Sequence, residues 1–134
     1  MLDSLKSLRR LISKDLASVL ARGYNLSPSQ EHGIGGGEVH VLTAPHTPLA
    51  IAVLRERGRP QILFSFTDRE FTAQAKWADI SYARVATGAA SDPQPLEARS
   101  LQSQVQRLID VLDELEAVAQ KDWRGATRRL DSRR

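Results

Sequence analysis

The chain has 134 residues and no cysteine, and 41% of its residues are hydrophobic and 26% are charged. These values are typical of a single folded domain, and they exclude a disulfide framework, a thiolate metal site and a thiol nucleophile. The net charge of +3 is unevenly distributed, since residues 1–22 carry +3, residues 97–120 carry −3 and residues 121–134 carry +4. Charged residues interrupt the N-terminal leucines, so we expect no signal peptide and no membrane span, and we predict a cytoplasmic protein.

The N-terminal region has the apolar spacing of an amphipathic helix. Its apolar positions recur at intervals of three and four residues: Leu5, Leu8, Ile12, Leu16 and Val19. This pattern predicts a helix over residues 3–22 that ends at Gly23, because glycine adopts the left-handed conformation without steric cost. The following glycine-rich stretch, residues 23–37, is predicted to be a loop without regular structure.

Three short runs of β-prone residues follow, at 39–43, 49–54 and 62–67. Their short connections predict an antiparallel meander. In the third run Ile62, Phe64 and Phe66 alternate with smaller or polar residues, which predicts one apolar sheet face. We expect these three residues to belong to the core, together with Phe71.

The third run leads into a second predicted helix. Thr67 and Glu70 have the spacing of a capping box, and Phe66 and Phe71 flank them as a hydrophobic staple does. The pattern predicts a helix that begins at about Asp68 and ends at Gly88.

A final helix is predicted after the turn at residues 91–95. Its apolar residues alternate at spacings of three and four, as in a heptad seam: Leu101, Val105, Leu108, Leu112 and Leu115, with Ala98 and Ala119 at its ends. This face is compatible either with packing on the chain's own sheet or with self-association. The predicted strands are shorter than the helix, so part of the leucine row is expected to overhang the sheet and to mediate a homodimer.

The predicted fold is therefore α+β, with the order αβββαα. Residues 1–125 form the domain in this prediction, and residues 126–134 form a basic, disordered tail whose removal leaves the fold intact.

Catalytic, cofactor and metal sites are not indicated by the sequence. Glycines 33, 35, 36 and 37 follow a helix and precede a strand, the reverse of a phosphate-binding loop. Glu38 and His40 would share one strand face, but no third metal ligand is fixed by the pattern. No serine lies in a Gly-x-Ser-x-Gly motif, so we predict no enzyme.

Basic residues suggest an alternative function. Arg55, Arg57 and Arg59 surround Gly58 in the second hairpin turn, where they could bind phosphates or could simply keep a sheet edge soluble. The candidate nucleic-acid surface consists of these three arginines and three further residues, Lys76, Arg128 and Arg129.

The predicted order helix, three strands, helix over residues 3–87 resembles the double-stranded-RNA-binding domain. Pro45 and His46 in the first hairpin loop, Gly58 in the second, and Ala73, Ala75 and Lys76 on the second helix lie roughly where that family has comparable residues. The resemblance implies RNA binding through the minor grooves and the phosphates between them. The family's lysine cluster at the start of the second helix is replaced here by Asp68, Arg69, Glu70 and Phe71.

The sequence favours a non-enzymatic protein-interaction module, a homodimeric adaptor or chaperone-like protein that binds itself and a second, unidentified protein. The alternative is a nucleic-acid-binding protein. The two hypotheses differ in salt dependence, because phosphate contacts weaken steeply with salt and an apolar interface does not.

Overall fold

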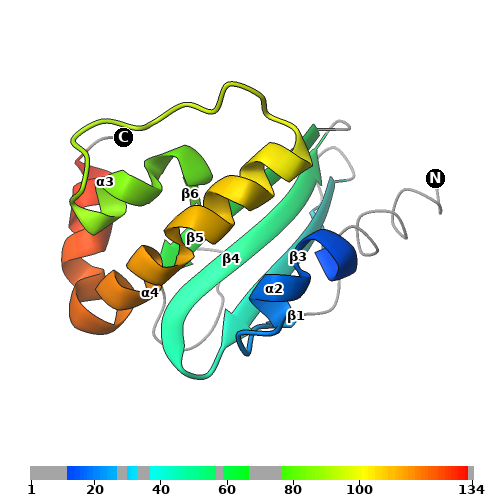
Figure 1. Ribbon diagram of the computed structural model, residues 1–134, viewed down its shortest axis with the longest axis horizontal. Helices are drawn as coiled ribbons and strands as arrows, with labels where there is room; N and C mark the ends of the chain where they lie inside the picture. The colour runs from blue at the N-terminus through cyan, green and yellow to red at the C-terminus, as the bar shows by residue number, and fades with distance from the viewer. Residues whose placement is uncertain (1–11, 27–29, 33–36, 57–58, 67–76, 133–134) are drawn as a thin grey trace.

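The computed structural model describes residues 12–26, 30–32, 37–56, 59–66 and 77–132, which form a mixed α+β structure (Figure 1). Its strands are β1 (Asn25–Leu26), β2 (Gln30–His32), β3 (Gly37–Ala44), β4 (Thr47–Glu56), β5 (Arg59–Phe66) and β6 (Ala78–Asp79). Residues 12–15 are helical, followed by α2 (Ala17–Leu20), the 3-10 helix η1 (Ile80–Tyr82), α3 (Ala83–Thr87) and α4 (Leu101–Asp131). None of the helices in these ranges is both long and apolar enough to cross a membrane.

The predicted antiparallel meander is confirmed. Val41 of β3 pairs with Ala52 of β4, which in turn pairs with Leu63 of β5. Ile62, Phe64 and Phe66 are buried, as the alternation in the third run predicts, whereas Phe71 lies outside the described residues. The complete path through the sheet is β1-β3-β4-β5-β6, and β2 also pairs with β3.

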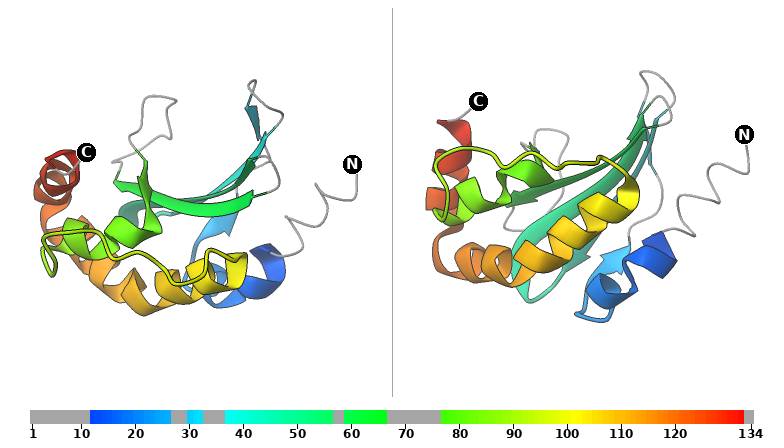
Figure 2. Two further views of the ribbon diagram at one scale, coloured as in Figure 1. Left: turned by 90° about the horizontal axis from the view of Figure 1, so that it is seen from above. Right: turned by 45° about the horizontal axis from the view of Figure 1, so that its top comes forward.

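The described helices all lie on one face of this sheet (Figure 2). The core between them contains Leu42, Ile51 and Phe64 from the sheet and Leu108 and Leu115 from α4. The opposite sheet face carries a smaller apolar cluster built on Val39, Val41 and Ala52. The described part of the chain is therefore one sheet with a helical layer on a single side.

The predicted loop over residues 23–37 is wrong in two places. Asn25–Leu26 and Gln30–His32 form β1 and β2, which pair side by side with different parts of β3. Neither segment has the composition of a strand. The regular structure of both segments therefore depends more on pairing with β3 than on their own β propensity. Gly23, which precedes them, has a φ of +104° and ends the N-terminal helical region as predicted.

The second predicted helix is wrong over Ala78 and Asp79, which form β6 against Leu63 and Phe64. Asp79 then caps η1, since the Ser81 N–H donates to its Oδ2 at 3.0 Å, and α3 ends at Gly88 with a φ of +83°. Thr67, Glu70 and the predicted start at Asp68 lie outside the described residues. The double-stranded-RNA-binding domain would continue its second helix at this position, but this chain forms the strand β6. The order of elements therefore does not match that family here.

The final helix begins at Leu101, with Ser100 as its cap, rather than near the prolines at 93 and 95. It is kinked at Asp122, whose backbone is non-helical at φ −160° and ψ 59°. The Gly125 N–H donates to Asp122 Oδ1 at 3.1 Å, so Asp122 caps a second helical segment. A Cβ at Gly125 would lie 2.1 Å from Asp122 Oδ2, so a larger residue here would displace the carboxylate that caps the segment.

The segment expected to be a disordered tail therefore differs from that prediction, because residues 126–131 continue α4 after the kink. Ala126 and Leu130 are buried. Figure 1 shows this last part of α4, in red, turned back beside α3.

The leucine face of α4 is packed on the chain's own sheet. All five predicted self-association residues are buried in the single chain: Leu101, Val105, Leu108, Leu112 and Leu115. The expected overhang is absent because β3 and β4 contain 8 and 10 residues, which gives lengths of about 26–33 Å. Residues 101–121 span about 30 Å before the kink, so the sheet covers them fully.

Candidate binding groove

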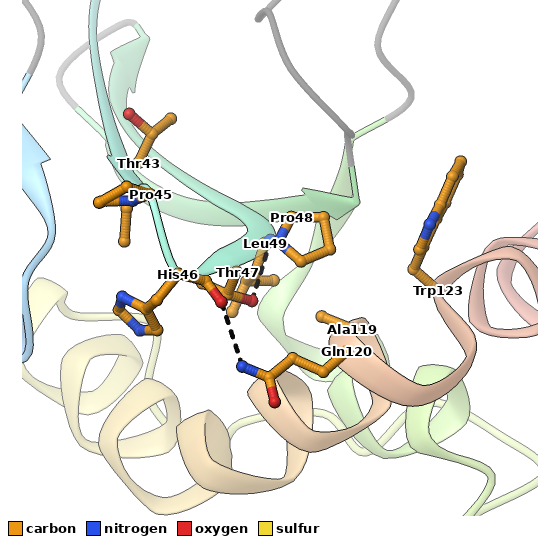
Figure 3. A pocket seen from close by; sticks show the side chains of 10 residues that line it. Thr43, Pro45, His46, Thr47, Pro48, Leu49, Ala119, Gln120 and Trp123 are labelled. Atoms are coloured by element: carbon orange, nitrogen blue, oxygen red, sulfur yellow. Dashed lines mark hydrogen bonds between the residues drawn. The ribbon is translucent and has the colours of Figure 1, made fainter.

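A groove opens where the β3–β4 hairpin meets the last straight turn of α4 (Figure 3). Its volume is about 510 Å³. The described residues that line it are Thr43, Ala44, Pro45, His46, Thr47, Pro48, Leu49, Ala119, Gln120 and Trp123. The groove is thus formed by segments more than 70 residues apart in the chain.

Two structural irregularities produce this groove. The pairing of β3 with β4 shifts register between Thr43 and Ala44, just before the turn that contains Pro45 and His46. Across the groove, the helix breaks at Asp122, and Trp123 stands immediately after the break. The Gln120 side chain joins the two walls, since its Nε2 donates to the His46 carbonyl oxygen at 3.1 Å.

Trp123 is the largest side chain on the helical wall. It is half-buried, and it projects beside the groove on the side of Pro48 (Figure 3). The Arg124 guanidinium lies 5.2 Å from the centroid of its ring, within cation–π range. A half-exposed indole with two prolines and a few polar groups resembles the surfaces that bind protein segments.

Behind the hairpin, Glu116 of α4 contacts three side chains from two separate parts of the chain. Its Oε2 accepts from the Tyr24 hydroxyl at 2.8 Å and lies 3.2 Å from His46 Nε2, and its Oε1 pairs with Arg22. Arg22 also pairs with Asp113 at 2.5 Å. We call this set of residues the polar junction: Arg22, Tyr24, His46 and Glu116. It connects the β3–β4 hairpin to α4 and to the end of the N-terminal helical region.

The ionisation of the polar junction suits a structural role. Burial raises the pKa of the Tyr24 phenol, and its hydrogen bond to Glu116 raises that pKa further. Burial alone would raise the pKa of Glu116, but hydrogen bonds from Tyr24, Arg22 and His46 outweigh it and lower that pKa overall. Tyr24 therefore remains a neutral donor, and Glu116 remains a charged acceptor. The ring of His46 is turned away from the groove toward this junction (Figure 3).

Of the two residues considered for a metal site, the structure describes the side chain of His40 alone. His40 is buried on the helix-facing side of the sheet, opposite Val53, and the side chain of Glu38 is outside the described set. In the described ranges no three His, Asp or Glu residues are placed to hold a metal ion.

The candidate nucleic-acid residues are divided between the two ends of α4. Arg57 and Lys76 lie outside the described residues, Arg55 is half-buried, and Arg59 is exposed at the β4–β5 hairpin. Arg128 and Arg129 belong to the opposite end, where Arg129 Nε and Nη2 donate to the Ala86 carbonyl oxygen at 3.0 and 2.7 Å. The described members therefore do not form one continuous basic surface.

No protein-family model matches this chain, and no similar curated protein or solved structure was found.

Of the groove residues, the sequence drew attention to Pro45 and His46, through the resemblance to the double-stranded-RNA-binding domain, and it did not indicate a groove. Trp123 is the available signal, because a lone tryptophan in a polar, charged helical segment is typical of an interface position. Pro48 and Gln120 carry no comparable signal, since only the packing of α4 on the hairpin makes them neighbours.

Proposed function

We propose that this protein is a non-enzymatic binding module that recognises a segment of another protein in the groove beside Trp123. The observation that carries this proposal is the pairing of a half-exposed indole with Pro45 and Pro48 in a groove of about 510 Å³. Among its described lining residues, His46 has the one ionisable side chain, and that ring contacts Glu116. The groove thus offers apolar contact and neutral hydrogen-bonding groups rather than acid–base chemistry.

A protein segment suits this groove better than a nucleic acid does. Tryptophan supplies a large apolar contact area, and side chains of this kind contribute most of the binding energy in many interfaces. A nucleic-acid partner would need a row of cations, and the described members of the candidate nucleic-acid surface are divided between the two ends of α4. The leucines first expected to bind a second copy are buried in the single chain. The proposal therefore places recognition in the groove instead.

Site-specific cross-linking tests the proposal. A photoreactive amino acid with a small aliphatic diazirine side chain, close to glutamine in length, faces the groove at position 120 without filling it. The same group at position 102 provides the control, because Gln102 is exposed near the other end of α4. In an extract of the source organism, treated with nuclease, we expect a discrete cross-linked protein from position 120 and none from position 102. Species that disappear on nuclease treatment would favour the nucleic-acid alternative.

Competition supplies the second control. Excess unlabelled protein should abolish the cross-link, and the Gln120→Trp variant, which fills the groove, should fail to compete. A Gln102→Trp variant should compete as well as the natural chain does. Equal competition by both variants, with both folded by circular dichroism, would contradict recognition in the groove.

A further inference from the structure

The outer edge of β5 is only partly covered by a neighbouring strand. β6 pairs with Leu63 and Phe64, so within the described residues β5 continues past it through Pro60 and Ile62 with no strand paired on that side. Backbone groups left unpaired at a sheet edge can pair with a strand from another chain.

At this position a side chain of α4 occupies the place of a strand. Gln104 is 0% exposed, and its Oε1 accepts from the Ile62 N–H at 2.8 Å. Its Nε2 donates to the Pro60 carbonyl oxygen at 3.0 Å and to the Arg99 carbonyl oxygen at 3.1 Å. A glutamine amide carries the same donor and acceptor as a peptide group, and it satisfies the N–H and C=O that two alternate residues of β5 direct to one side.

Neighbouring contacts close the same edge. Asp79, at the end of β6, accepts from Arg99 Nη2 at 2.5 Å and from Gln61 Nε2 at 3.4 Å. Burial alone would raise the pKa of Asp79, but hydrogen bonds from Arg99, Ser81 and Gln61 lower it overall, which keeps this carboxylate charged. Arg99 thus contacts Asp79 through its side chain and Gln104 through its backbone.

The covered strand has the composition of a segment that self-associates. Residues 61–66 are Gln-Ile-Leu-Phe-Ser-Phe, with no charge and no proline. Uncharged six-residue segments with high β propensity can stack into intermolecular sheets when their edge is exposed. The Gln104 amide occupies the backbone groups of this edge at Pro60 and Ile62.

We propose that Gln104 is an edge cap, a side-chain amide that replaces a strand beside β5 and blocks strand pairing between copies of this chain. The proposal is independent of the groove, which lies at the other end of α4. Gln104 lies on the otherwise apolar face of the helix. A hydrophobic residue at this position could not hydrogen-bond to the Ile62 N–H or the Pro60 carbonyl oxygen.

Amide hydrogen exchange tests the local contact. Successive N–H groups of a strand point to opposite sides, so the Leu63 N–H faces β4 and serves as the internal reference for Ile62. In Gln104→Met, which keeps the length of the side chain without its amide, we expect exchange at Ile62 to accelerate at least about 10-fold relative to Leu63. Val111→Ala, a buried change on the same helix, should alter both amides by the same factor. Equal changes at Ile62 and Leu63 in Gln104→Met would overturn the assignment.

A labelled peptide with the sequence of Arg59–Phe66 tests the consequence for pairing. Under conditions where each protein is folded, fluorescence anisotropy should show at least about 10-fold tighter peptide binding by Gln104→Met than by the natural chain or Val111→Ala. Gln104→Leu, which also lacks the amide and suits a buried helical position, should lose protection at Ile62 as Gln104→Met does and provides the readout if the methionine variant does not fold. Peptide binding that is equal for all folded variants would show that Gln104 does not guard this edge.

Discussion

The two segments of α4 on either side of Asp122 differ in their sequence pattern and in the contacts that hold them to the rest of the chain. The first, residues 101–121, presents a regular row of leucines to the sheet and is fixed at its ends by Gln104 and Gln120. The second, residues 123–131, is rich in arginine and has few large apolar residues, but it buries Ala126 and Leu130. Helical structure and burial therefore extend beyond the region where the hydrophobic pattern is obvious.

The second segment shows that a short helix can pack against the core with only two apolar residues at helical spacing. Ala126 and Leu130 are four residues apart, so they lie on one helical face, and both are buried against the core. Arg129 adds a polar contact, because its guanidinium caps the carbonyl of Ala86 near the C-terminal end of α3. An arginine that the sequence suggests is part of a solvated tail can thus cap the C-terminal end of a neighbouring helix.

The largest expected effect concerns the first segment. Leu112→Asp places an uncompensated charge at a site that is 1% exposed, and such a charge costs about 3–5 kcal/mol of folding free energy. Ile109→Asp is the matched control on the same helix, because Ile109 is 39% exposed. Urea unfolding should show a large loss for Leu112→Asp and a change of about 0.5 kcal/mol or less for Ile109→Asp.

Light scattering distinguishes this result from loss of a dimer. If the leucine face mediates self-association, Leu112→Asp should remain folded with an unchanged melting temperature, and the mass should decrease to 14.9 kDa. An unfolded or strongly destabilised Leu112→Asp variant is the outcome expected from packing within one chain.

A smaller effect is expected in the second segment. Leu130→Ala removes a buried side chain near the end of α4, which should lower the free energy of unfolding by about 2–3 kcal/mol. Arg128→Ala, at an exposed position two residues earlier, should have little effect. Denaturant titration of both variants measures the difference, and equal stability of the two would restore the prediction of a disordered tail.

The smallest effect concerns the polar junction that holds the first segment to the hairpin. Since the pKa of Glu116 is lower in the folded chain, its stabilising contribution is present above the ordinary glutamate pKa and is lost as pH falls through the lowered value. Glu116→Gln should cost about 1.5 kcal/mol at pH 7 and should reduce the loss of stability on acidification. Urea unfolding at pH 7 and at lower pH values measures this dependence.

Glu114→Gln is the control for this experiment, because Glu114 is exposed on the same helix. Its variant should keep the acid sensitivity of the natural chain. If Glu116→Gln and Glu114→Gln respond identically to pH, the contacts of Glu116 do not contribute to stability.

The central part of the fold could be predicted from local pattern. Alternation placed Ile62, Phe64 and Phe66 in the core, and the glycines at 23 and 88 marked helix ends, because each of these features depends on a residue's own geometry. The leucine row predicted a long helix but not its partner, since the same spacing suits a sheet in one chain or a helix in another.

Pairing and packing between distant segments were decided only by the tertiary structure. Short strands such as β1, β2 and β6 exist because β3 and β5 offer them backbone groups, and their sequences carry no strong strand preference. The candidate groove has the same origin, because Trp123 and Pro48 become neighbours only where the helix ends its path across the sheet. Local sequence determines secondary-structure propensity and the periodicity of buried residues. The surface of the folded protein depends instead on which elements pack together, because the free energy of that packing comes from residues far apart in the chain.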